Sequence, residues 1–123
     1  MEILIFFCGI HSLAFALFHV SFWKLFQWKK DLKNITYVNR AIIQIANIRL
    51  IYFFLFTSVL CFVFPVDLVE SRLGQFYLIG MSLFWMGRTI EQWIFFKNHH
   101  WINYTLTFSF ILGAVLFVLP VLF

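Results

Sequence analysis

Long apolar runs, separated by short polar stretches, fill most of this chain. The first and last of them contain no Asp, Glu, Lys or Arg. Crossing a hydrocarbon core about 30 Å thick takes roughly 17–25 helical residues, and each run reaches that length. The runs cover residues 3–23, 50–66, 73–96 and 101–123. This pattern predicts an all-α, multi-pass membrane protein.

We therefore expect a single domain, residues 1–123, in which four transmembrane helices form an antiparallel bundle. The composition fits this class, because 63% of the residues are hydrophobic, 11% are charged and the mean hydropathy is +0.94. The expected helices lie at about 2–25, 40–64, 73–96 and 101–122, with a basic interfacial connection at 24–40.

Charge in the connections predicts the orientation. The first connection is rich in cations, whereas the second has Arg72 against Asp67 and Glu70, and the third has Lys97. The cations of the first connection are Lys24, Lys29, Lys30, Lys33 and Arg40. The positive-inside rule then places both termini on the outer side of a bacterial cytoplasmic membrane.

The same connection predicts the partner of these cations. Trp23, Phe26 and Trp28 alternate with lysines, which is typical of a short interfacial helix or a belt of anchors. We expect anionic lipid headgroups at Lys24, Lys29, Lys30 and Lys33. The net charge of +4 is therefore no nucleic-acid signal.

The second helix carries a polar stripe. Steps of three, four and seven residues place Arg40, Gln44, Asn47 and Ser58 on one side, facing protein, while Arg49 points to the opposite side. This stripe predicts a buried polar cluster in the inner half of the membrane.

The third helix is expected to add charges to that cluster. Residues 73–87 span only about 22 Å, so Arg88 and Glu91 are drawn into the membrane. Gly80, Gly87 and Glu91 share a face, which predicts that Glu91 faces a neighbouring helix. Two interpretations stay open: a salt bridge that locks the bundle, or an anion or proton site. The candidate ligand-binding residues are Arg49, Arg88, Glu91, Gln44, Asn47, His19 and Arg40.

Histidines and cysteines do not predict a metal centre. His11 and His19 line one side of the first helix about 12 Å apart, too far for one ion. Haem would need His11 or His19 from a second copy, and the pair His99 and His100 offers too few ligands. We expect no cofactor.

Cys8 and Cys61 are predicted to be small hydrophobic residues, with a disulfide between them as the alternative.

The segments "LFQWKKDLKNITYVNRAIIQIAN" and "LFWMGRTIEQWIFF" resemble a group of small, functionally uncharacterised bacterial four-helix integral membrane proteins. That resemblance implies the fold. The segment "NRAIIQIANIR" is similar to the glutathione-handling four-helix membrane enzymes, and this resemblance implies glutathione binding by Arg40, Gln44 and Asn47. The segment lacks the glutamates that accompany these residues in those enzymes.

Four functions are therefore open. The leading one is binding of an anionic lipid-like or small acidic ligand by an oligomeric membrane protein. The alternatives are a structural or partner-binding subunit, a glutathione-type enzyme, and a proton or ion path. No catalytic motif occurs in the chain, so the enzyme is an alternative only.

Overall fold

A computed structural model describes residues 2–96 and 100–123, and this part of the chain is all-helical, without a strand. Lys97 and His99 lie outside the described residues. The elements are α1 (Glu2–Val20), α2 (Phe22–Leu25), α3 (Trp28–Asp31), the 3₁₀ helix η1 (Leu32–Asn34), α4 (Tyr37–Val63), α5 (Pro65–Glu70), α6 (Arg72–Phe95) and α7 (Trp101–Leu122).

Three of these helices are long and apolar enough to cross a membrane: α1, α4 and α7. The predicted class, an all-helical membrane protein, is confirmed to this extent. The 24 residues of α6 would extend about 36 Å, but α6 carries Arg72, Arg88 and Glu91 and is not among the three.

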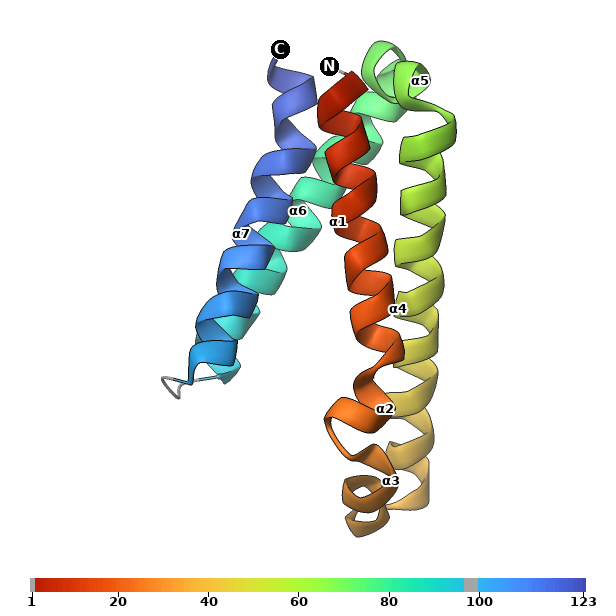
Figure 1. Ribbon diagram of the computed structural model, residues 1–123, viewed down its shortest axis with the longest axis vertical. Coiled ribbons are helices and arrows are strands. Elements are labelled where there is room, and N and C mark those ends of the chain that lie inside the picture. Colours follow the sequence, from red (N-terminus) through yellow and green to blue (C-terminus); the bar gives the residue numbers. More distant parts are fainter. Residues whose placement is uncertain (1, 97–99) are drawn as a thin grey trace. The chain divides into compact units, whose positions relative to one another are not determined.

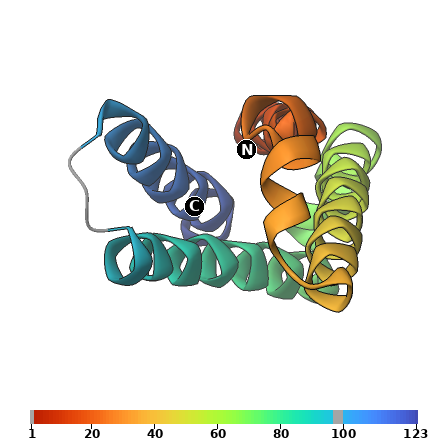
Figure 2. The same cartoon turned by 90° about the horizontal axis from the view of Figure 1, so that it is seen from below.

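The described chain divides into two compact units, Gly9–Leu60 and Met1–Cys8 with Cys61–Phe123. Figure 1 shows their elements. In the unit Gly9–Leu60 the chain descends along α1, turns through α2, α3 and η1, and returns along α4. Figure 2 shows the short helices alongside α4.

The first connection consists of three short helices, α2, α3 and η1, rather than one continuous interfacial helix. The helix expected to reach residue 25 ends instead at Val20, and Gln27 between α2 and α3 has a left-handed backbone with φ of 51°. A left-handed residue commonly follows a helix end because it reverses the chain direction there. Gln27 thereby brings Trp28 back to Trp23, with ring centroids 5.4 Å apart.

The unit Gly9–Leu60 buries polar residues and exposes apolar ones along α4. Asn47, Thr57 and Ser58 are buried, whereas Ile45 and Ile48 are exposed. Aromatic rings complete the α1–α4 contact, since Phe54 lies 6.0 Å from Phe15 and 5.3 Å from His19 between ring centroids. An apolar exterior around a polar interior is the arrangement expected in lipid.

In the second unit α6 and α7 pack antiparallel (Figure 1). The rings of Trp85 and Phe110 stack at 5.7 Å, and Ser82 Oγ donates to the carbonyl of Ala114 at 2.7 Å. Cys8 and Cys61 are buried free thiols, as predicted, and Cys8 Sγ donates to the carbonyl of Leu116 at 3.1 Å.

A tight turn joins α5 to α6. Ser71 caps α6, because its Oγ accepts from the Gly74 backbone N–H at 2.8 Å and donates to the Asp67 carbonyl at 2.6 Å. A Cβ on Gly74 would lie 2.5 Å from the Asp67 carbonyl oxygen and 2.5 Å from Leu68 Cα. Only glycine therefore permits the backbones to approach this closely.

We predict that Gly74→Ala destabilises the protein, because the added methyl group collides with backbone that cannot rotate away. Overpacking of this kind costs typically 1–3 kcal/mol. Gly80→Ala on the same helix is the matched control, since a Cβ there would meet nothing within 4 Å. In thermal melts of the detergent-solubilised protein, Gly74→Ala should melt below the parent and Gly80→Ala should not. Equal melting temperatures for the two variants would contradict the tight turn.

Candidate functional site

A ladder of three hydrogen-bonded residue pairs joins the α1–η1 segment to the first half of α4. The pairs are His19 with Asn47, Trp23 with Gln44, and Leu32 with Arg40. Successive members on α4 are three or four residues apart, so they follow one face of the helix. This is the face predicted for the polar stripe, and all three side chains on it are buried or half-buried.

The first pair is made by two reciprocal hydrogen bonds. His19 Nδ1 donates to Asn47 Oδ1 at 2.8 Å, and Asn47 Nδ2 donates to the His19 carbonyl at 2.9 Å. His19 lies in the last turn of α1, whose carbonyls lack intrahelical partners. Asn47, 4% exposed, satisfies one of them. The structure thus brings together His19 and Asn47, two of the predicted site residues.

The next pairs form a continuous chain. Trp23 Nε1 donates to Gln44 Oε1 at 2.9 Å, and Gln44 Nε2 donates to the Arg40 carbonyl at 3.2 Å. The Arg40 guanidinium donates to the Leu32 carbonyl at 3.3 Å and lies 5.8 Å from the centre of the Tyr37 ring. These bonds fix the connection against α4. They also occupy the indole N–H of Trp23 and one amide N–H of Gln44, which are then not available to a ligand.

An open hollow of about 490 Å³ lies over these pairs. Its volume falls within the range of roughly 300–1,000 Å³ that is usual for small-molecule sites. Apolar walls come from the indoles and from a buried leucine. The lining residues are Trp23, Lys24, Trp28, Lys29, Leu32, Arg40 and Gln44.

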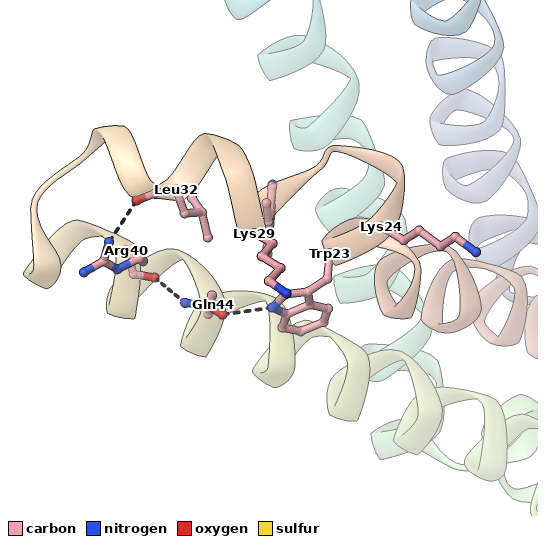
Figure 3. A pocket seen from close by; sticks show the side chains of 7 residues that line it. Trp23, Lys24, Lys29, Leu32, Arg40 and Gln44 are labelled. Carbon is pink, nitrogen blue, oxygen red and sulfur yellow. Dashed lines mark hydrogen bonds between the residues drawn. The ribbon is translucent and has the colours of Figure 1, made fainter.

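The hollow is strongly cationic. Lys24, Lys29 and Arg40 line it, and none of its described lining residues is acidic. Figure 3 shows Lys29 reaching from α3 toward Trp23 and Gln44, whereas Lys24 extends away from them. Within the described ranges neither lysine has a hydrogen-bond or ion-pair partner. Unpaired ammonium groups beside an arginine favour an anion.

Of the predicted ligand-binding residues, the structure brings Arg40, Gln44, Asn47 and His19 together in the ladder. Arg49 lies elsewhere on α4: it is exposed, and its guanidinium is 5.6 Å from the centre of the Tyr52 ring. Helical spacing predicts that Arg49 lies on the side of α4 opposite Arg40, Gln44 and Asn47. Ligand binding by Arg49 stays a prediction.

Glu91 lies in the last turns of α6, and the expectation that it faces a neighbouring helix stays a prediction. Its side chain is exposed, and added methyl groups at Gly80 or Gly87 would meet nothing within 4 Å. The helical wheel identifies a shared face but not whether a neighbour covers it. Arg88, three residues earlier, is half-buried, with its guanidinium 4.6 Å from the centre of the Phe110 ring on α7.

Trp23, Trp28 and Leu32 are site residues that the sequence interpretation missed, since the indoles were assigned to an interfacial belt. No local signal in the sequence could have found them, because the left-handed backbone of Gln27 brings Trp28 back to Trp23. Among the described residues, no group of three or more His, Cys, Asp or Glu side chains is placed to hold a metal ion.

Comparisons with protein-family models, with curated proteins and with solved structures found no match to this chain. The chemistry of the site is therefore argued from its own residues: three cations, two indoles and an amide that is held in place by hydrogen bonds.

We predict that Asn47→Leu destabilises the protein, because it removes both bonds to His19 and leaves the His19 carbonyl without this partner. Leaving a buried polar group unsatisfied costs about 1–3 kcal/mol. The control is Asn39→Leu, which changes an exposed asparagine at the start of the same helix. Detergent-solubilised Asn47→Leu should melt several degrees below Asn39→Leu. If the two variants melt together, the first pair does not hold α1 to α4.

Proposed function

We propose that the chain spans the bacterial cytoplasmic membrane four times, through α1, α4, α6 and α7, with both termini outside. The first connection supports this orientation, because it holds five cations and lies between two apolar helices. The length of α6 supports its inclusion as the fourth span, since about 36 Å exceeds the hydrocarbon thickness.

In this orientation the hollow lies at the inner leaflet, and we propose that it binds an anionic lipid headgroup. The observation that carries the proposal is the cluster of Lys24, Lys29 and Arg40 without an acidic lining residue. Anionic lipids concentrate negative charge at this leaflet, where each juxtamembrane cation contributes about 1 kcal/mol of attraction. The local chemistry and the location therefore favour the same class of ligand.

The apolar walls support a lipid over a soluble anion. Trp23, Trp28 and Leu32 provide hydrocarbon and aromatic surface beside the cations. Leu25 and Phe26, next to the hollow in sequence, are 53% and 40% exposed. Such a surface would be costly in water and suits the headgroup–acyl boundary, where indoles are commonly found.

A second candidate function, a partner-binding subunit, is favoured by Glu91. A charged residue at the centre of a membrane helix costs roughly 2.5–3.5 kcal/mol on insertion scales, and a smaller cost applies toward the helix ends, where Glu91 lies. Glu91 is exposed on α6, next to the open surface at Gly87. A second protein, or another copy of this chain, that donates a hydrogen bond to Glu91 would remove much of that cost.

Lipid retention tests the leading proposal. We predict that native mass spectrometry of the purified protein will detect bound anionic lipid, and that Lys29→Gln will lower its retention roughly three- to tenfold, because one charge-assisted contact is lost. Adding excess glutathione should leave the bound lipid in place. Displacement by glutathione would instead favour the enzyme alternative.

The matched control is Lys30→Gln. Lys30 is the next residue along the chain and carries the same charge, but it does not line the hollow. Lys30→Gln should retain lipid as the parent does. If both variants lose bound lipid equally, the cations of the connection attract lipid without a defined site. If Lys29→Gln retains as much lipid as the parent, the hollow is not the binding site.

A further inference from the structure

We infer that the hollow selects a lipid whose phosphate carries two negative charges, as a terminal phosphate monoester or diphosphate does. This inference rests on the proposed function, since it specifies the ligand of the same site. It would distinguish such lipids from the abundant phosphodiester lipids, which carry one charge per phosphate.

Charge balance is the first step. Lys24, Lys29 and Arg40 bring three positive charges to one hollow, and no described lining residue offsets them. Asp31, the acidic residue of the same connection, is exposed and does not line the hollow. A monoanionic headgroup would leave two cations uncompensated, whereas a phosphate monoester brings about −1.5 to −2 near pH 7.

The available donors are the second step. The indole N–H of Trp23 is given to Gln44, and the Gln44 amide donates to the Arg40 carbonyl. The lining donors that remain are mainly the charged N–H groups of Lys24, Lys29 and Arg40. Charged donors suit terminal phosphate oxygens, of which a monoester has three. A zwitterionic headgroup would instead add an ammonium group to a site that already holds three cations.

The placement of the cations is the third step. Arg40 lies on α4 and Lys29 on α3, and Gln44 lies between them in Figure 3, while Lys24 extends toward the other end. A guanidinium binds two phosphate oxygens at once, and a lysine beside it can reach a third. The hollow of about 490 Å³ has room for a phosphate with the first carbons of its lipid against Trp23 and Trp28.

The test is competition between phosphatidic acid and phosphatidylglycerol with identical acyl chains, measured by native mass spectrometry of the full chain. At pH 7.5 the parent should retain phosphatidic acid about tenfold better. At pH 5.5 that preference should shrink, because the second ionisation of a phosphate monoester lies near pH 6. Phosphatidylglycerol keeps its single charge over this range and so controls for titration of the protein.

Variants separate the two proposals. Lys29→Gln should lose the preference for phosphatidic acid, and Lys33→Gln, a cation of the same connection outside the hollow, should keep it. Equal retention of both lipids by the parent, with both reduced in Lys29→Gln, would overturn the selectivity and leave the lipid site standing. Retention that is independent of Lys29 would overturn both.

A final arm distinguishes a lipid from a free phosphate compound. Inorganic pyrophosphate in excess should displace little bound phosphatidic acid, because it lacks acyl chains to contact the apolar walls. Complete displacement at comparable concentration would show that the hollow recognises the phosphate alone, and it would overturn the assignment to a lipid.

Discussion

The two hydrogen bonds between Asn47 and His19 are the interaction on which the α1–α4 unit depends. The last turn of a helix leaves carbonyl groups without intrahelical partners, and leaving a buried one unsatisfied is costly. Asn47 donates to one of these carbonyls and accepts from the His19 ring. This pair thereby fixes where the end of α1 lies along α4.

The remaining pairs follow from that register. One turn beyond His19 the chain reaches Trp23, and one turn back from Asn47 lies Gln44, so the indole and the amide meet. Gln27 then reverses the chain, and Arg40 binds the carbonyl of Leu32. Each bond uses a neutral donor or a backbone acceptor, and the lysines are left without partners in the described chain. A structural ladder thus produces a cationic surface as its consequence.

Much of this arrangement could be predicted from the sequence. Long apolar runs predicted the membrane class, and helical spacing placed Arg40, Gln44 and Asn47 on one face with Arg49 opposite. These predictions depend only on periodicity, which is local. His19 and Asn47 were both named as candidate residues of one site, but their hydrogen bonds depend on how α1 packs against α4.

Other features depend on tertiary contacts, which the periodicity of the sequence does not reveal. Trp23 was assigned to an interfacial belt, since nothing local indicates that Gln27 adopts a left-handed backbone and returns the chain to α4. Glu91 shares a face with two glycines, but helical spacing does not indicate whether another helix covers that face. The requirement for glycine at position 74 likewise arises from α5, whose backbone lies 2.5 Å from the position of a Cβ there.

The central claim is that the hollow beside α4 holds an anionic lipid headgroup. Its most direct test is an experimental density map of the protein extracted with its native lipids. The account predicts headgroup density in the hollow, within hydrogen-bond distance of Lys29 and Arg40, with Trp23 bonded to Gln44 behind it. A map in which Lys29 and Arg40 contact only protein and water, while ordered lipid headgroups lie elsewhere on the molecule, would contradict it.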